Sequence, residues 1–207
     1  MNERVLLAYH MFEQEGVGAP LPSGVLGKEV QKNIMAHPIR KERLRYIATL
    51  CEGIQSPLAL YTRAYALSWS GAAARPDAIC AMLEYIHNGV IPSELPNNEQ
   101  TEKLRAWDWY TLGQAYEGEY QFSEAYEAYA KALSLHPALS PAAIKQSEVL
   151  VKMGKIDDAI NQLKAYQASK ACTPQLEASV AFYIKKIEEQ KKKGYVFKPK
   201  KKSKTSS

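Results

Sequence analysis

Residues 106–139 read AWDWYTLGQAYEGEYQFSEAYEAYAKALSLHPAL, and this stretch decides the fold of the chain. Leu112 and Tyr116 stand four residues apart, so they share one face of a helix and can bury against a partner helix. Gly113 is small, and small residues let two helix backbones approach closely where they cross. Pro137 ends the second helix, because proline disfavours helical backbone before it. The stretch therefore predicts a helix, a turn and a second helix.

Eight residues of this stretch keep a fixed spacing, W-x2-L-G-x2-Y followed by Ala, an aromatic residue, Ala and Pro. They are Trp109, Leu112, Gly113, Tyr116, Ala125, Tyr129, Ala132 and Pro137. The spacing resembles the tetratricopeptide repeat (TPR), a helix–turn–helix unit of 34 residues. The resemblance implies an all-α, right-handed stack of antiparallel helical hairpins. It also implies binding of other proteins in a concave groove, which the first helix of each pair lines, rather than covalent chemistry.

The turn of this repeat is expected between its two helices, at residues 117–119. Gly118 can supply the backbone geometry of the turn. The Ser123 hydroxyl is a candidate N-cap of the second helix, because it can accept a hydrogen bond from a free backbone N–H.

More divergent copies follow at the same period, starting at Ser140 and Pro174. The expected elements are helices over 141–153 and 156–169, a turn at Gly154, an N-cap at Asp157 and a single helix over 174–193. A proline suits the first turn of a helix, and a terminal helix with a polar outer face caps a repeat array. The TPR resemblance is strong over 106–173.

The chain before residue 106 fits the repeat less well. A hairpin over 57–72 and 76–88 matches weakly, and the segment 89–101 contains the proline and glycine residues of a loop. Further elements are expected as helices over 3–14 and 39–53 and a loop over 16–24. The predicted parts are a divergent helical region over 1–56, a repeat array over 57–193 and a basic, mostly disordered tail over 194–207.

Composition indicates a folded, all-α protein. Hydrophobic residues make up 46% of the 207 residues, and the alternation typical of strands does not persist. The sequence contains no run of 18 apolar residues and no apolar N-terminal run long enough for a signal peptide, so we expect no membrane association. Cys51, Cys80 and Cys172 lack disulfide or metal spacing. We therefore expect buried free thiols in a reducing compartment, and a cytoplasmic protein.

The net charge of +5 is unevenly divided. Residues 191–207 contain eight lysines and no acid, so this tail carries +8 and residues 1–190 sum to −3. A lysine-rich tail can bind nucleic acid, an acidic partner or, through Lys200–Lys204, a nuclear import receptor, which makes nuclear localisation the alternative. A tail that is only solvated is equally open. Tyr195 and Phe197 can stack on bases, but we expect them to fold back onto the last helix.

The sequence carries no signature of a catalytic or metal site. It lacks the phosphate-binding G-x-x-x-x-G-K-[ST] motif and the H-E-x-x-H motif, and its four histidines are too scattered for a local metal site. We therefore expect no enzyme activity, no cofactor and no metal.

Function in a TPR array is expected on the groove, at first-helix positions that the signature does not use. Trp107 and Tyr110 are aromatic at such positions, and aromatic residues are common binding hot spots. TPR proteins that clamp a carboxylate carry Lys and Asn where this chain has Tyr110 and Gln114, so we do not expect that activity. The candidate ligand-binding residues are Trp107, Tyr110, Gln114, Glu117, Ile144, Glu148, Phe182 and Lys185.

These observations predict a non-catalytic interaction module, an adaptor or scaffold, that holds a peptide or a helix in its groove. The alternative is a nucleic-acid-associated or regulatory protein that uses the lysine-rich tail. Self-assembly through the ends of the array is a third interpretation. Salt dependence separates the first two, because phosphate contacts weaken steeply with salt.

Overall fold

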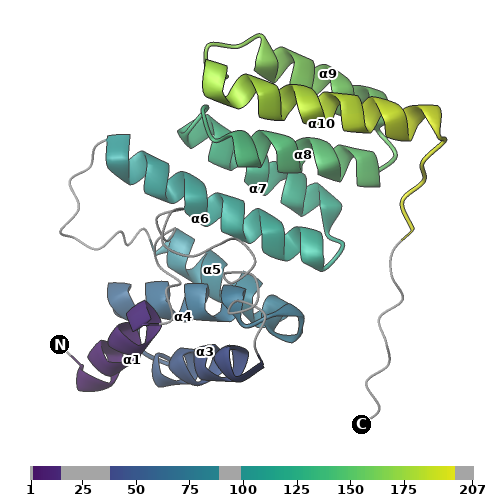
Figure 1. Cartoon of the computed structure of the whole chain (residues 1–207). Helices are drawn as coiled ribbons and strands as arrows, with labels where there is room; N and C mark the ends of the chain where they lie inside the picture. Colours follow the sequence, from purple (N-terminus) through teal and green to yellow (C-terminus); the bar gives the residue numbers. More distant parts are fainter. Residues whose placement is uncertain (1, 15–37, 89–98, 199–207) are drawn as a thin grey trace. The chain divides into compact units, whose positions relative to one another are not determined.

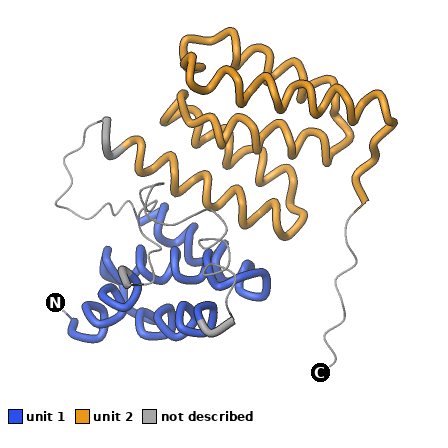
Figure 2. The backbone as a smooth tube through the Cα atoms, in the orientation of Figure 1, with its two compact units in different colours: residues 1–101 blue, residues 102–207 orange. Residues whose placement is uncertain are grey.

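The computed structural model describes residues 2–14, 38–88 and 99–198, and the regular secondary structure of these residues is helical. The chain divides into two compact units, residues 1–101 and residues 102–207 (Figure 2). The predicted all-α fold of right-handed, antiparallel helical hairpins with a capping helix is confirmed. The loop predicted over 16–24 lies outside the described residues. Among the helices that the structure describes, none combines the length and the apolar character that a bilayer-spanning helix needs.

Within residues 2–14 and 38–88, the structure of the first unit shows two single helices and one hairpin. Its helices are α1 (Glu3–Gln14), α3 (Pro38–Leu50), α4 (Pro57–Trp69) and α5 (Arg75–His87), with a short 3-10 turn at Ala72–Ala74 (Figure 1). The Ser56 hydroxyl accepts from the Ala59 N–H at 3.3 Å, and Pro57 occupies the first turn, so side chain and backbone together start α4.

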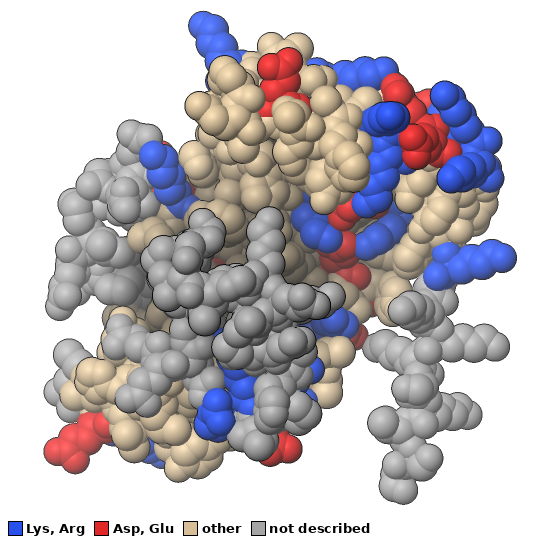
Figure 3. Space-filling model, viewed as in Figure 1, with Lys and Arg blue, Asp and Glu red and all other residues tan. Residues whose placement is uncertain are grey.

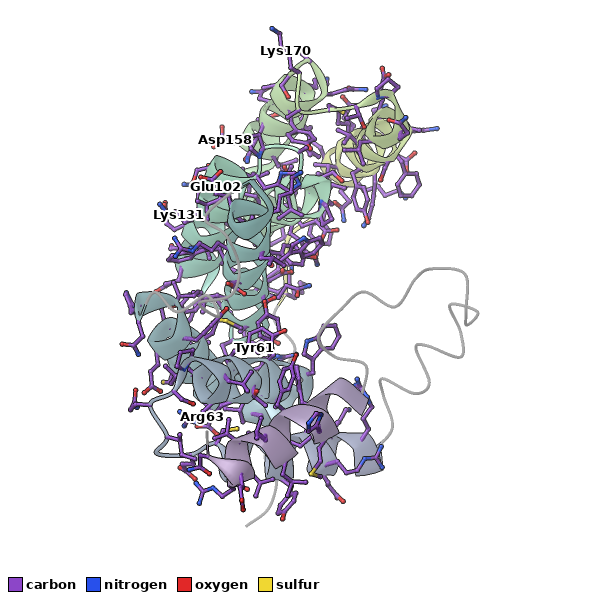
Figure 4. The ribbon with its side chains drawn as sticks, turned by 90° about the vertical axis from the view of Figure 1, so that its left-hand side faces the viewer. Tyr61, Arg63, Glu102, Lys131, Asp158 and Lys170 are labelled. Atoms are coloured by element: carbon purple, nitrogen blue, oxygen red, sulfur yellow. The ribbon has the colours of Figure 1, made fainter. Side chains whose placement is uncertain are left out.

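An apolar stripe of α1 joins the single helices to this hairpin. Val5, Ala8 and Phe12 recur at spacings of three and four and are buried. The Phe12 ring meets Tyr61 of α4 edge-on with 6.0 Å between centroids, whereas Arg63 leaves α4 on another side (Figure 4). Helices α1 and α3 therefore share one compact unit with the α4–α5 hairpin, because both pack on α4.

The three cysteines are free but differ in exposure. Cys51 is buried, and burial raises the pKa of its thiol to about 11 against the opposing charges of Arg4 and Arg63. Cys172 is half-buried, and Cys80 is exposed. The prediction of buried thiols is therefore wrong for Cys80, which lies on the outer face of α5.

The second unit contains two hairpins and a capping helix. Its helices are α6 (Glu99–Gly118), α7 (Phe122–Leu135), α8 (Ser140–Lys152), α9 (Ile156–Gln167) and α10 (Pro174–Lys192). Helix α6 already begins at Glu99, so the loop predicted over 89–101 ends earlier than expected, and residues 89–98 lie outside the described chain. α8 and α10 lie side by side, each packed against α9 (Figure 1).

Helices α6, α8 and α10 end with the same backbone turn. In each helix, the three N–H groups after the last residue bond back to carbonyls near the helix end, around a residue with left-handed backbone. That residue is Gly154 (φ 81°) after α8, Gly194 (φ 63°) after α10 and Tyr120 (φ 64°) after α6. The prediction that Gly118 supplies the first turn is therefore wrong, because Gly118 still belongs to the helix.

The predicted N-caps of α7 and α9 are also wrong, because the left-handed residues determine where these two helices begin. α7 and α9 each start two residues after the left-handed residue, with Gln121 and Lys155 as their N-caps. Ser123 and Asp157 consequently lie inside the first turns of these helices.

The α6–α7 crossing is built around Gly113. A Cβ atom at this position would lie 2.6 Å from Cε1 of Tyr129, inside van der Waals contact. Tyr129 is buried, and its ring lies against Ala125 and Val149 in one core cluster. Leu112 and Ala132 are also buried, Trp109 and Tyr116 are half-buried, and Pro137 is exposed just beyond the end of α7.

The segment after α10 returns toward the α6–α7 turn. We expected Tyr195 and Phe197 to cover the last helix, and this is wrong for Phe197. Its ring lies edge-on to Phe122 of α7, with 5.4 Å between centroids. The left-handed turn at Gly194 ends α10, and the segment after it leaves the helix axis (Figure 1).

Candidate functional site

The first helices of the second unit present a continuous surface, which we call the α6–α8–α10 face. Its side chains are Trp107, Tyr110, Gln114, Glu117, Lys145, Glu148, Lys152, Phe182, Tyr183, Lys185 and Lys186. Lys131 of α7 and Asp158 of α9 point to the opposite side of the unit, away from α10 (Figure 4). Acidic and basic side chains on these helices gather toward the end where α6, α8 and α10 terminate (Figure 3).

Aromatic side chains of α6 form one part of this face. The Trp107 side chain is exposed and meets Tyr110 edge-on, with 5.3 Å between ring centroids. Tyr110 in turn leans on the buried Tyr129 at 5.7 Å, and its hydroxyl accepts from the Gln114 side-chain amide at 3.1 Å. Tyr129 and Gln114 thus hold the Tyr110 ring, which supports the exposed indole from one side.

A charged cluster forms the other part. The Glu117 carboxylate accepts from the Tyr129 hydroxyl at 2.8 Å and pairs with Lys152 and, at 3.5 Å, with Lys145. Only 10% of the Glu117 side chain is exposed, so these partners replace most of its water. The cluster therefore ties the end of α6 to both α7 and α8.

Glu148 extends the cluster from α8 to α10. Its carboxylate pairs with Lys145 at 3.0 Å and with Lys186 at 3.4 Å. The Lys186 ammonium also lies 5.0 Å from the centroid of the Tyr183 ring, a cation–π contact. Each of the lysines at positions 145, 152 and 186 thus already has a carboxylate partner within the face.

Helix α8 presents a different edge from the one that the sequence predicts. Ile144 was expected in the groove, but it is buried in a core cluster with Ile160 of α9 and Ile184 of α10. The side chains turned toward α6 are instead Lys145 and Lys152, which pair with Glu117. Lys145 directly follows Ile144, and Lys152 directly follows Val151, which is buried in the same core cluster. Sequence reasoning missed these lysines; the apolar character of Ile144 is the signal that could have located them.

The remaining candidates lie on α10. Phe182 is 63% exposed and meets Tyr183 edge-on at 5.6 Å, and Lys185 is exposed. The structure thus brings Trp107, Tyr110, Gln114, Glu117 and Glu148 together with the missed residues Lys145, Lys152, Tyr183 and Lys186. Phe182 and Lys185 extend the face along α10.

The cluster changes the acidity of its members. Burial by itself raises the pKa of the Glu117 carboxyl, but the Lys152 ammonium, the Lys145 charge and the Tyr129 hydroxyl outweigh burial and hold this pKa below its usual value. Burial lowers the pKa of Lys145, yet Glu117 and Glu148 outweigh it and raise that pKa. The two directions agree, so the ionised pair is the stable form.

The lowered pKa of Glu117 makes a prediction about acid stability. The carboxylate contributes fully above its unfolded pKa near 4.5, and the contribution is lost as the pH falls through the lower folded value. At pH 7, Glu117→Gln should lower the free energy of unfolding by about 2 kcal/mol, as loss of hydrogen bonds to a charged group does. Urea titrations at pH 7 and in acid should show this deficit shrinking as the pH falls below 4.5 and through the lowered folded pKa.

The exposed carboxylate of Glu127, on α7, provides the matched control. Glu127→Gln should cost less than about 0.5 kcal/mol at both pH values, as surface substitutions do. A deficit of Glu117→Gln that is equally large at both pH values would show that its charge does not stabilise the fold.

Comparison with known proteins supports the fold. No protein-family model matches this chain, and no curated protein is significantly similar to it. A solved structure titled "Crystal structure of MamA protein" superposes with a TM-score of 0.50 and 15% identity, over 96% of this chain and 100% of that chain. A second, "Crystal structure of MamA", gives a TM-score of 0.47 and 19% identity, over 85% and 98%. MamA is a TPR protein, so the likeness of the first indicates a TPR-like fold and nothing about ligands.

Proposed function

We propose that this protein is a non-catalytic interaction module that binds a peptide or a helix of another protein along the α6–α8–α10 face. The observation that carries the proposal is Trp107, whose side chain is 42% exposed and lies against the Tyr110 ring, which in turn packs on the buried Tyr129. A TPR-like fold, in which first helices line the groove, supports the same surface.

The aromatic part supplies the contact area. A rigid indole gives a large apolar surface at a low cost in side-chain entropy, and tryptophan is enriched among binding hot spots. Phe182, exposed on α10, adds a second aromatic surface to the same face. A partner with apolar or aromatic side chains fits this arrangement best.

The charged part argues against a partner bound mainly through salt bridges. Lys145, Lys152 and Lys186 already pair with carboxylates of the face. A competing carboxylate would have to replace those pairs, so little net free energy would be gained. Binding along the face should therefore depend weakly on salt.

The test is a random peptide library selected on the full chain, with the selected peptides titrated into labelled protein. The indole N–H resonance of Trp107 should shift, and that of Trp69 should not. Trp69 is the matched control because its side chain is 40% exposed, on α4. Selected peptides that leave the Trp107 resonance unchanged would contradict the proposed site.

The lysine-rich tail supports a second candidate, binding of nucleic acid or of an acidic partner. Lys192, Lys193 and Lys198 are exposed, which leaves their ammonium groups accessible to phosphates. Deleting residues 199–207 removes four more lysines. The deletion should leave the melting temperature unchanged, because this segment is almost free of apolar residues.

The same deletion tests the candidate directly. It should reduce the slope of log affinity against log salt for single-stranded nucleic acid by about 3, since each lost phosphate contact removes about 0.7. An unchanged slope would exclude the tail as the binding element.

A further inference from the structure

The segment after α10 places the Phe197 side chain against Tyr120, Phe122 and Lys152, and we call these three residues the seat. The Phe197 ring lies 5.4 Å from the Phe122 ring and 6.3 Å from the Tyr120 ring. The Lys152 ammonium lies 5.9 Å from the centroids of both phenylalanine rings. Phe197 is half-buried between these groups, whereas the adjacent Val196 is 73% exposed.

The seat contains the unusual backbone of Tyr120. Left-handed backbone is disfavoured for residues with a Cβ atom and is normally left to glycine, as at Gly154 and Gly194, which hold the same place after α8 and α10. Tyr120 instead carries a ring that contacts both Phe122 and Phe197. A strained position kept at one of three equivalent turns points to a local role of its side chain.

The seat also connects to the charged end of the face. Lys152, which lies over the Phe197 ring, is the same lysine that pairs with Glu117. Phe122 is the first residue of α7, directly after the turn that ends α6. Whatever fills the seat therefore lies against the end of the α6–α8–α10 face.

We propose that Tyr120, Phe122 and Lys152 form a binding site for a phenylalanine side chain, and that Phe197 fills it from within the chain. Residues 194–198 then form a displaceable strap, which holds the Phe197 ring beside Lys152 at the charged end of the face. The strap is held by one ring and the helix-ending turn at Gly194, so a competing phenylalanine can take its place. The inference does not depend on a ligand in the groove.

The test vacates the seat and refills it from solution. Full-length chain carrying Phe197→Ala is titrated with a synthetic peptide of residues 193–204, and aromatic resonances of Tyr120 and Phe122 are followed by NMR. An attached segment has a millimolar effective concentration. The peptide should therefore bind the Phe197→Ala chain at least about ten-fold more tightly than it binds the wild-type chain.

Matched peptides and chains separate the ring from general attraction of the lysines. A peptide with alanine in place of Phe197 should lose the shifts, a peptide with alanine in place of Val196 should keep them, and a Val196→Ala chain should behave as wild type. Equal binding to wild-type and Phe197→Ala chains, no shift in the Phe197→Ala chain, or equal binding of the phenylalanine-free peptide would each overturn the proposal.

A second variant tests the seat itself. Tyr120→Gly, introduced together with Phe197→Ala, restores the glycine that the equivalent turns carry, so the melting temperature should not fall below that of Phe197→Ala. The affinity for the peptide should nevertheless drop at least about three-fold, because one ring of the seat is missing. Unchanged affinity in this folded variant would show that the peptide binds elsewhere.

Discussion

Replacing Gly113 by leucine is expected to lower the free energy of unfolding by about 3 kcal/mol. The first atom of any side chain at this position would lie 2.6 Å from the Tyr129 ring. That ring is buried, contacts Tyr110 and donates its hydroxyl to Glu117, so it cannot move aside without breaking these contacts. Overpacking of this kind costs about 1–3 kcal/mol, and leucine adds three further carbons. Urea denaturation followed by circular dichroism measures the change.

Gly113→Ala decides between two opposing effects. Alanine favours a helix over glycine by about 1 kcal/mol, whereas contact with the ring costs more than that. We expect net destabilisation, and a gain in stability would place Gly113 outside the helix crossing. Gln114→Ala, at the exposed neighbouring position, is the control and should change stability by less than about 0.5 kcal/mol.

Trp107 and Trp109 are expected to have opposite roles. Two residues apart, their side chains point about 200° away from each other around the helix. Trp109 packs against a cluster containing Ala106, Ala132 and Leu139, whereas Trp107 is exposed. Trp107→Ala should therefore cost little stability. It should weaken the binding of a groove-binding peptide by about 2 kcal/mol, or about 30-fold in affinity, as loss of a hot-spot residue does.

Trp109→Ala should destabilise the fold by about 3 kcal/mol, the lower end for large-to-small core changes, because this side chain is only half-buried. Peptide affinity of the folded Trp109→Ala variant should stay within about three-fold of wild type. The control is Trp69→Ala, which removes an exposed indole from the other unit and should leave peptide affinity unchanged. If denaturation shows Trp107→Ala to be more damaging than Trp109→Ala, the assignment of Trp107 to the binding face is wrong.

The helices of the second unit could be predicted closely because their signals are local. Apolar residues at helical spacing, prolines at helix starts and Gly154 at a turn act within a few residues of one another along the chain. The period is also visible from the sequence. In the structure, the left-handed residues Tyr120 and Gly154 are 34 residues apart, which matches the 34-residue period of the repeat.

The side of α8 that faces α6 was harder to predict. The 34-residue period predicts which residue of α8 corresponds to a given residue of α6, but it does not predict how α8 is rotated about its own axis. Counting 34 residues from Tyr110 leads to Ile144. Burial of Ile144 and Val151 against α9 and α10 turns the helix so that Lys145 and Lys152 face α6. Rotation is set by where the largest apolar surface is buried, and that depends on the neighbouring helices.

The sequence by itself determined that this chain is an all-α stack of helical hairpins, and it indicated Trp107 and Tyr110 as the aromatic part of the candidate face. Only the tertiary structure decided which charges meet at Glu117, where Phe197 lies, and that Tyr120 rather than Gly118 makes the turn. Hairpins follow from spacing within one or two helices. Ion pairs and the seat of Phe197 join residues from α6, α7, α8 and the strap, whose side chains meet only after the helices have packed.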